Sequence, residues 1–422
     1  MRIWLIKIGE PLPVANSDDR LHRTGLFFEK LSSYGHDVIW WSGTFDHARK
    51  KHLFNKDKKI ELSKNASLYL IHSIGYKKNI SFRRALDHIE LASKFTYLSR
   101  QQDIPDVIFC SMPTLELSMA AVNYGNKYNV PVIIDLRDMW PDIFIARAPT
   151  YFQLFLKIIL FHYFYQIKTV CKKATAITGI TSGYVDWGMQ YAGRNKTRFD
   201  RDFPLGYSAA TPEHGKIRTA ELDWRERGVI CPENNKFIVC LFSNMVRQLE
   251  LETVIAAARR LESTDRAFSF VFCGDGDSLE YFKEVAKGCS SISFPGWVNK
   301  PQIWTLMRYA HVGLAPYRSS KDFIISIPNK VIEYMSAGLP VISSLKGTVQ
   351  ELLTKYAAGL TYENENVDDL FDLLSDLYDN PNKLMIMSKN SKKLFEERFV
   401  AEKIYSEMCD YLEEIVTNFK NG

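Results

Sequence analysis

Short apolar runs that alternate with amphipathic stretches are the feature that most constrains the fold of this 422-residue chain. The alternation is typical of α/β proteins, in which each buried parallel strand is followed by a helix that packs on the sheet. The pattern starts at Ile3 and restarts at Phe237, after a polar segment with Pro and Gly, Pro204–Glu233, which we interpret as a linker. We therefore predict two doubly wound units, as the usual domain size of about 100–200 residues also favours.

The predicted elements give two Rossmann-like domains. In the first half we expect strands at Ile3–Ile8, Val38–Trp41, Val107–Cys110, Val130–Asp135 and Ala176–Thr178, with helices over about Arg20–Ser33 and Leu115–Tyr128. In the second half we expect strands at Phe237–Phe242, Phe268–Cys273, Val312–Ala315 and Pro340–Ser343, a helix at Glu252–Leu261 and a closing helix at Ala401–Phe419. The expected boundaries are 1–205 for the first domain and 206–398 for the second, with a helix in 399–422 that packs back towards the first.

Composition excludes several classes of protein. With 46% hydrophobic and 13% aromatic residues, the chain is neither disordered nor a coiled coil. Its seven cysteines are odd in number, scattered and without a C-x-x-C pair, which fits neither a disulfide framework nor a zinc site and favours a reducing compartment. The apolar run at the N-terminus is too short for a signal peptide, so we expect a cytoplasmic protein.

Two segments bear on membrane contact. Tyr151–Val170 is the most apolar stretch, but Lys157 and Lys168 interrupt it, and a spanning helix needs about 20 apolar residues. We interpret it as a buried amphipathic helix, the alternative being a helix on a membrane surface. The segment 49–84 holds eleven basic and two acidic residues, a net charge of +9, which leaves −4 for the rest of a chain of net charge +5. The basic segment forms either a solvated face of the protein or a surface that attracts anionic lipid. No sequence motif of RNA- or DNA-binding proteins accompanies it.

A possible ligand site lies between Asp322 and Glu351. Ser326 can cap a helix that has Pro328 in its first turn, and Gly338 can end that helix before a buried strand. A helix N-terminus presents unpaired N–H groups and positive potential, so it can hold a diphosphate. Glu333 could accept hydrogen bonds from ribose hydroxyls, or it is a solvent-exposed helix residue.

Several motifs carry a resemblance to a known family. The sequence E-Y-M-S-A-G-L-P-V-I at 333–342 resembles the donor-site motif of glycosyltransferase family 4, which are retaining enzymes of the GT-B fold. Asp135–Asp142 is similar to the R-D-x-W-P element of bacterial capsule and O-antigen transferases. Ile8–Pro13, Arg20–Gly25 and Gly35–Val38 match their first strand, loop and helix. The resemblance spans nearly the whole chain and implies two Rossmann-like domains that face a central cleft.

The resemblance also implies a donor site. Glu333 matches the glutamate that binds the nucleotide ribose, and Arg247 matches a basic residue that binds the diphosphate, the alternative being a surface arginine. Main-chain N–H groups of three residues would bind phosphate, with the Lys330 side chain directed either to the donor or to solvent. These residues are Ile327, Asn329 and Lys330. Gly274 and Trp297 match turns that line the nucleotide.

The sequence departs from the family pattern at the donor site. The first of two motif glutamates is Ile325 here, and Ser243 and Val246 replace glycines in the loop that carries Arg247. These departures motivate the alternative of a nucleotide-binding inactive partner subunit. A sugar-nucleotide 2-epimerase, which shares the fold, is disfavoured because Asp135–Asp142 resembles the transferases.

For catalysis, the resemblance implies front-face departure of the diphosphate without a protein nucleophile. Asp138, at the end of a predicted strand, is the candidate that orients the acceptor hydroxyl or accepts its proton, the alternative being a cap of the following turn. Weaker acceptor-site candidates are Glu10, Arg20, His22 and Arg23.

We expect no metal and no cofactor, the nucleotide-sugar being a substrate. The D-x-D at Asp200–Asp202 follows no buried strand and is interpreted as linker, and no histidines show metal-ligand spacing. The expected protein is a retaining transferase, peripheral on the inner face of the cytoplasmic membrane. We expect three partners: a nucleotide-sugar donor, with a UDP-sugar as the first choice; an acceptor oligosaccharide linked to polyprenyl diphosphate; and an anionic membrane surface. We expect no nucleic-acid partner.

Overall fold

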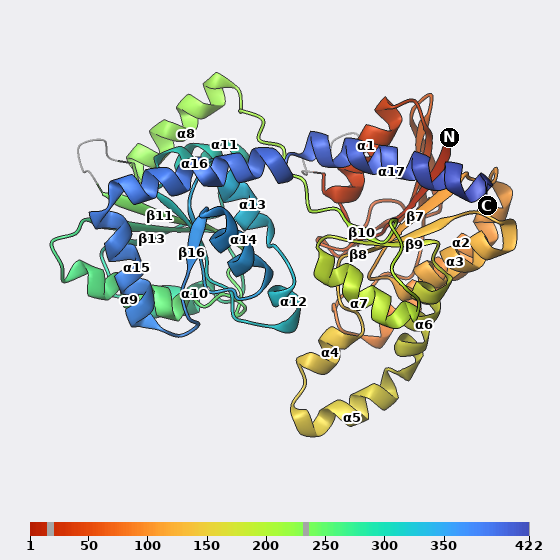
Figure 1. The fold of residues 1–422 in the computed structure, drawn as a ribbon, viewed down its shortest axis with the longest axis horizontal. Coiled ribbons are helices and arrows are strands. Elements are labelled where there is room, and N and C mark those ends of the chain that lie inside the picture. The colour runs from red at the N-terminus through yellow and green to blue at the C-terminus, as the bar shows by residue number, and fades with distance from the viewer. Residues whose placement is uncertain (15–20, 231–235, 422) are drawn as a thin grey trace. The chain divides into compact units, whose positions relative to one another are not determined.

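The computed structural model describes residues 1–14, 21–230 and 236–421. It divides the chain into two compact units, of which unit 1 is Met1–Gly206 with Ala401–Gly422 and unit 2 is Tyr207–Val400. The boundaries expected from the sequence lie at 205/206 and 398/399, one and two residues from these divisions. Both units are α/β, with helices on both faces of a largely parallel sheet (Figure 1). The predicted α/β class is therefore confirmed.

Unit 1 contains an eight-stranded sheet in the order β10-β9-β8-β7-β1-β2-β6-β5, parallel except for the antiparallel pair β5–β6. Its strands are β1 Arg2–Ile6, β2 Asp37–Gly43, β5 Lys58–Ser63, β6 Ala66–Ile71, β7 Val107–Ser111, β8 Val132–Leu136, β9 Ala176–Gly179 and β10 Arg201–Asp202, and a separate small hairpin joins β3 Phe45–Asp46 to β4 Lys51–His52. Because the inner strands are buried on both faces, they are the continuous apolar runs of the sequence. The chain order reverses beside β1, so the carboxyl ends of β1, β7 and β8 mark one functional edge.

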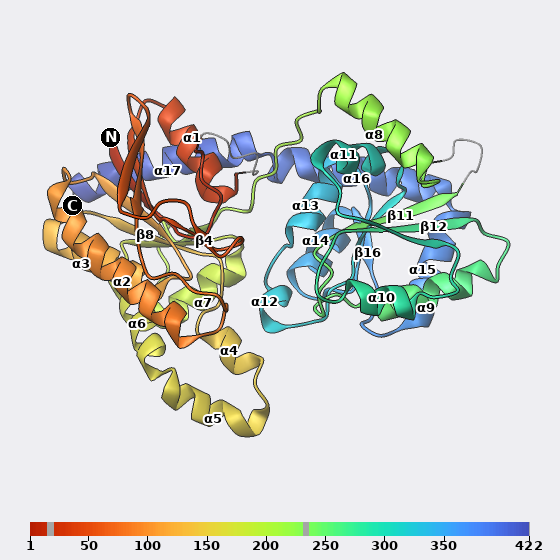
Figure 2. The ribbon, with the colours of Figure 1, turned by 180° about the vertical axis from the view of Figure 1, so that it is seen from behind.

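The helices of unit 1 are α1 Arg23–Ser33, α2 Phe82–Leu98, α3 Leu115–Tyr128, α4 Asp142–Ala146, α5 Thr150–Ile159, α6 Phe161–Lys173, α7 Ser182–Ala192 and α17 Ala401–Asn421, with a 3₁₀ turn at Ser99–Gln101. The closing helix α17 packs along α1 (Figure 2). Its Ile404, Met408 and Leu412 join Phe27 and Phe109 in the core, so the last helix completes the first unit.

The apolar stretch at Tyr151–Val170 does not form the buried helix predicted for it. It forms α5 and α6, which meet at Leu160, and α5 has no buried residue at all. Large side chains on α5 face solvent, with 88% of Tyr151, 72% of Leu154 and 69% of Ile158 exposed. In the described part of the chain no one helix has the length and apolarity to cross a membrane, whereas α5 and α6 taken together, bent by 68°, meet that test by length and composition. The α4–α5 segment extends away from the sheet of unit 1 (Figures 1 and 2).

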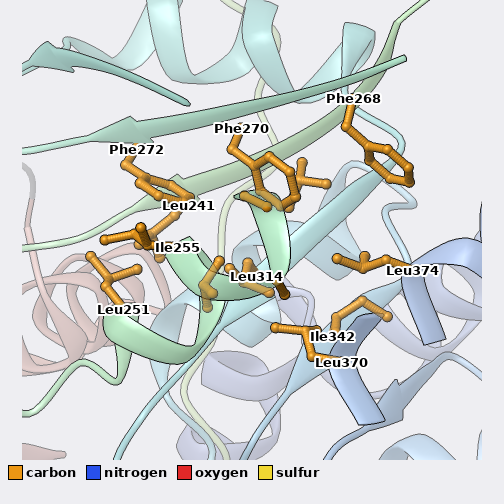
Figure 3. Packing of buried hydrophobic residues seen from close by; sticks show 14 of the residues in the cluster. Leu241, Leu251, Ile255, Phe268, Phe270, Phe272, Leu314, Ile342, Leu370 and Leu374 are labelled. Atoms are coloured by element: carbon orange, nitrogen blue, oxygen red, sulfur yellow. The ribbon is translucent and has the colours of Figure 1, made fainter. Parts of the chain in front are cut away.

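Unit 2 contains a six-stranded, entirely parallel sheet in the order β13-β12-β11-β14-β15-β16. Its strands are β11 Phe237–Phe242, β12 Phe268–Cys273, β13 Ile292–Gly296, β14 Val312–Ala315, β15 Val341–Ser343 and β16 Gly359–Thr361. Its helices are α8 His214–Glu226, α9 Leu251–Glu262, α10 Leu279–Val285, α11 Lys300–Tyr309, α12 Lys321–Ile324, α13 Asn329–Ser336, α14 Thr348–Tyr356, α15 Val367–Asp379 and α16 Pro381–Arg398. Figure 3 shows phenylalanines of β12 in one buried cluster with leucines of α9 and α15, so these helices pack on the sheet of unit 2.

Three local predictions are wrong. The segment interpreted as a linker contains α8, whose Ile217 and Trp224 are buried, with the Trp224 indole N–H donating to the carbonyl of Gln302 at 2.9 Å. The D-x-D is not linker either, because Arg201–Asp202 forms β10 and Asp200 is buried. The helix expected after Ser326 begins at Asn329, since Ser326 instead closes a turn onto Phe323.

Candidate functional site

A cavity of about 710 Å³ opens in unit 2 at the carboxyl ends of β11, β12 and β13. Its walls come from three strand-to-helix turns, from α11 and from the start of α13. The lining residues are Phe242, Ser243, Asn244, Cys273, Gly274, Asp275, Gly276, Asp277, Trp297, Val298, Ile303 and Lys330. This edge of a doubly wound sheet is where such folds bind ligands.

Main-chain hydrogen bonds hold the three turns against one another. The N–H of Ser243 donates to the carbonyl of Cys273 at 3.0 Å, and the N–H of Gly274 donates to the carbonyl of Gly296 at 2.8 Å. Gly274 has a φ of +141°, and a Cβ atom there would lie 1.8 Å from the Ser243 carbonyl oxygen. Only glycine allows this approach, so part of the cavity wall is closely packed main chain.

The helix α13 places its first turn at the cavity. The ring of Tyr334 packs where a side chain at Gly313 would lie, 2.2 Å from a Cβ atom built there, and the Tyr334 hydroxyl accepts a hydrogen bond from the N–H of Phe242 at 3.2 Å. No side chain caps the helix, which begins after Pro328. The first turn of α13, from which Lys330 lines the cavity, therefore has free N–H groups and positive potential.

Lys330 and Glu333 form a linked pair. Lys330 Nζ donates to Glu333 Oε2 at 2.7 Å, and the Tyr207 hydroxyl donates to Glu333 Oε1 at 3.0 Å. Glu333 is only 4% exposed, so the alternative of a solvent-exposed helix glutamate is excluded. Lys330 is the basic residue among those that line the cavity, and its hydrogen bond to Glu333 holds its side chain in place.

Part of the cavity wall is apolar. Trp297 lines it with 73% of its surface exposed, beside the buried Val298 and the partly buried Ile303 of α11. An exposed indole at a cavity rim offers a flat apolar face to a planar ring. Asp275 and Asp277 also line the cavity, and Asp275 Oδ1 accepts a hydrogen bond from the N–H of Gly276 at 2.8 Å.

The structure brings together some of the predicted donor residues and not others. Gly274, Trp297 and Lys330 line the cavity, and Glu333 supports it through Lys330. The other three, Arg247, Ile327 and Asn329, are not among the lining residues. Arg247 is exposed on the turn after β11, where its carbonyl accepts a hydrogen bond from Arg318 at 3.1 Å.

Sequence reasoning missed Tyr207 and Ile303. Ile303 carries a local signal, since it follows the capping box formed by Asn299 and Gln302 at the start of α11. Tyr207 carries none, because it lies 126 residues from Glu333 in the chain.

In unit 1, a buried ionic network surrounds Asp135 at the end of β8. Arg23 Nη2 lies 3.1 Å from Asp135 Oδ1, and Arg137 Nε lies 2.7 Å from Asp135 Oδ2. Arg137 also pairs with Glu10, which accepts two 3.0 Å hydrogen bonds from the N–H and the hydroxyl of Thr24. The side chain of Arg23 is thus buried in an ion pair with Asp135, and Glu10 links the loop after β1 to the start of α1.

The network shifts the pKa values of its members. Burial alone would raise the pKa of Asp135, but Arg23 and Arg137 outweigh it and hold that pKa far below its ordinary value. Burial also acts to raise the pKa of Glu10, and Arg137 and Lys7 overcome it and lower that pKa. For Lys7, burial and the neighbouring Arg137 lower the pKa to about 8. Both carboxylates are therefore ionised at neutral pH.

Asp138 follows this network directly. It is partly exposed just beyond β8, and its Oδ1 accepts a hydrogen bond from the N–H of Met139 at 2.7 Å, so it contacts the turn that follows it. His22 is exposed and precedes the first residue of α1, whereas Arg20 lies outside the described residues. The buried Asp200 pairs with the partly exposed Arg194 and accepts a hydrogen bond from the N–H of Ile177, which gives the D-x-D a structural role.

Within residues 1–14, 21–230 and 236–421, no group of three or more His, Cys, Asp or Glu side chains is arranged to hold a metal ion. The six described cysteines are buried free thiols, whereas Cys231 lies outside the described residues. The structure thus offers no disulfide among the described cysteines.

Comparison with known proteins relates this geometry to a family. Residues 223–394 match the family described as "Glycosyl transferases group 1". A search of curated protein sequences finds no match.

Solved structures resemble the whole chain. Sucrose-phosphate synthase from Thermosynechococcus elongatus has a TM-score of 0.71 at 15% identity, with 99% of both chains covered. Anabaena HepE in complex with UDP and glucose has a TM-score of 0.63 at 14% identity, with 98% of this chain and 100% of the other covered. WaaG, described as a glycosyltransferase involved in lipopolysaccharide biosynthesis, has a TM-score of 0.63 at 13% identity, with coverage of 97% and 99%. At these identities the likeness establishes the fold, which is GT-B with two Rossmann-like domains.

The family match falls within unit 2 and contains every residue that lines the cavity. Together with the GT-B fold of the full chain, it supports a glycosyltransferase.

Proposed function

We propose that this protein is a retaining glycosyltransferase of family 4. It would transfer a sugar from a nucleotide-sugar donor to an oligosaccharide linked to polyprenyl diphosphate, with a UDP-sugar as the first donor to consider. The product would belong to the biosynthesis of a surface polysaccharide of the capsule or O-antigen type. The observation that carries the proposal is the cavity in unit 2, which lies at the carboxyl edge of a doubly wound sheet and within the matched family segment.

The donor is assigned to this cavity by the chemistry of its walls. A uracil ring suits the exposed face of Trp297, and a diphosphate suits the Lys330 ammonium and the uncapped first turn of α13. Gly274 lets the turn after β12 pack against the Ser243 carbonyl, which fixes the main chain that lines this part of the cavity. The structure of HepE in complex with UDP and glucose supports UDP as the first nucleotide to test.

The acceptor is assigned to unit 1. Asp138 would orient the acceptor hydroxyl or accept its proton, and the network of Asp135, Arg137 and Glu10 would hold the end of β8 in place for it. The diphosphate would leave from the face that the hydroxyl attacks, so the protein contributes positioning and charge stabilisation. No metal or cofactor takes part in this proposal.

We further propose that the protein works as a peripheral protein on the inner face of the cytoplasmic membrane. The support is α5, whose large apolar side chains are all at the surface and whose Lys157 lies in the last turn. An exposed apolar helix with basic residues beside it is typical of an interfacial anchor.

Release of nucleoside diphosphate tests the proposed reaction. The purified protein is incubated with UDP-sugars in the presence of a lipid extract that contains polyprenyl-diphosphate oligosaccharides, and UDP and lengthened lipid product are measured. Product in the wild type, with at least about a tenfold loss in Lys330→Met, supports the proposal. Lys389→Met, a change at an exposed lysine of α16, is the control and should retain activity. Nucleotide binding without turnover of any sugar would instead indicate an inactive partner subunit.

A further inference from the structure

A second cluster of charge lies in unit 1, away from the ionic network at Asp135. Lys50 Nζ lies 5.0 Å from the centroid of the buried Tyr76 ring, and Arg84 Cζ lies 5.4 Å from the same centroid. Arg84 also lies over the ring of Trp140, at 4.8 Å. The sequence region that carries the net charge of +9 thus places two of its cations around one aromatic side chain.

The partners of these two cations are neutral. Lys50 Nζ donates to the Asn79 side-chain oxygen and lies 3.3 Å from His47 Nδ1, and Arg84 Nη1 donates to the Asn79 carbonyl at 2.8 Å. Arg84 Nε is buried and has no hydrogen-bond partner. Among the ion pairs of the described residues, neither cation is matched with a carboxylate. Asp46, the nearest acid in sequence to Lys50, is instead paired with Arg49.

The two cations act on each other and on His47, and the nearby Asp46 offsets this only in part. Burial and the nearby Arg84 lower the pKa of Lys50, and burial together with Lys50 and Arg84 lowers the pKa of His47 to about 4. His47 is therefore neutral at pH 7, and its ring and the Tyr76 hydroxyl, 2.6 Å apart, provide no negative charge. Two like charges that share a partly buried site repel each other, and a bound anion would remove that repulsion.

The cluster borders the acceptor side of unit 1. A Cβ atom at Gly9 would lie 3.6 Å from His47 Cβ, and Gly9 immediately precedes Glu10. Trp140, which Arg84 covers, follows Asp138 by two residues and packs edge-on against Phe144 of α4 at 4.7 Å. Because α4 contacts α5, a series of contacts leads from Arg84 through Trp140 and α4 to the exposed apolar helix.

Apolar side chains continue from the cations towards solvent. Ile80 and Phe82, at the start of α2, are both exposed and lie within four residues of Arg84. With α4 and α5 they place apolar surface beside a site for negative charge, which is the pattern that an amphiphile with a charged head would match.

We propose that Lys50 and Arg84 form an anion site that binds the phosphate groups of a diphosphate carried on an apolar chain, and that the chain lies towards Ile80, Phe82 and α5. The proposal rests on the proposed function, since this ligand is the lipid end of the acceptor. The arginine supplies a planar fork of donors and the lysine a point charge, and Asn79 holds both side chains.

Binding of farnesyl diphosphate to the full chain, measured by titration calorimetry, tests the site. In the double variant Lys50→Gln with Arg84→Gln we expect the dissociation constant to rise at least about tenfold. The control is Lys51→Gln with Lys78→Gln, which removes the same charge from two exposed neighbours and should change the constant less than about twofold. An equal loss in both variants would show diffuse attraction only and overturn the proposal.

Further arms identify the ligand and exclude misfolding. Vesicles of phosphatidylglycerol should bind both double variants alike, and a selective loss in the Lys50 and Arg84 variant would assign the site to lipid head groups and refute the acceptor assignment. The thermal midpoint of that variant should stay close to that of the wild type, because removal of the repulsion offsets the lost hydrogen bonds to Asn79 and the lost ring contacts. Its UDP binding in unit 2 should equal that of the wild type, so failure of this site is distinguishable from failure of the proposed function.

Discussion

The hydrogen bond from Tyr207 to Glu333 gives a prediction whose size can be worked from the structure. The Tyr207 hydroxyl donates to a carboxylate oxygen at 3.0 Å, and the carboxylate is buried. A hydrogen bond to a charged group contributes about 1.5–3 kcal/mol, and Lys330 still satisfies the other oxygen in Tyr207→Phe. We therefore expect a loss of about 2 kcal/mol in the local stability of α13, with the aromatic packing on Phe395 retained.

Native-state hydrogen exchange measures this loss directly. A change of about 2 kcal/mol corresponds to amide exchange about 30-fold faster in α13 when exchange reports the opening equilibrium. Amides of β1 and β7 in unit 1 serve as an internal control and should exchange at the wild-type rate. Tyr309→Phe is the matched variant, because that hydroxyl makes only a 3.3 Å contact with Glu221, and it should accelerate exchange less than about twofold.

Two results would refute the reasoning. Unchanged exchange in α13 of Tyr207→Phe would mean that the hydrogen bond does not hold the helix that carries Lys330. Equal acceleration in both units would mean a global effect rather than a local one.

Three other perturbations follow from the structure. Gly274→Ala puts a methyl group against the Ser243 carbonyl, so UDP affinity should fall at least about tenfold by calorimetry while unit 1 exchange stays unchanged. Because the native pKa of Glu10 is lowered, the ionised carboxylate contributes fully to the free energy of unfolding above about pH 4.3, and this contribution is lost as the pH falls towards the native pKa. In Glu10→Gln, the free energy of unfolding measured with urea should therefore fall less steeply at acid pH than in the wild type. An equally steep fall would contradict this. Leu154→Glu with Ile158→Glu should weaken flotation with anionic vesicles several-fold without lowering the thermal midpoint, since neither side chain is buried, whereas Leu222→Glu on α8 should leave flotation unchanged.

Much of the fold could be predicted because the sheets are parallel and buried. Phe237–Phe242 and Phe268–Cys273 appear as strands with the predicted bounds, since a strand covered on both faces is a continuous apolar run. The strand β6 at Ala66–Ile71 was missed because it lies inside the basic segment, where charge dominates the composition. The helix α8 had a signal, since Ile217, Ala220 and Trp224 recur at helical spacing within the polar stretch.

The site was predictable only where it depends on local chain geometry. Gly274 and Trp297 follow the strands β12 and β13, so their position at the carboxyl edge is a consequence of the topology. The contact of Tyr207 with Glu333 and that of Asn79 with Lys50 join side chains 126 and 29 residues apart in sequence, which periodicity does not reveal. Similarly, the apolar pattern of α5 indicates that one face avoids water, but it does not state whether protein or membrane covers that face.

Thermal unfolding of the full chain with UDP, GDP, dTDP, ADP and CMP in turn tests the donor cavity most directly. A nucleotide at 100 times its dissociation constant stabilises the unit that binds it by about 2.7 kcal/mol. We predict that one nucleoside diphosphate, UDP first, raises the unfolding midpoint of the wild type and of Lys389→Met, and that Lys330→Met loses most of this rise. If no nucleotide shifts the midpoint, or if Lys330→Met responds like the wild type, the cavity in unit 2 is not the donor site and the proposed function fails with it.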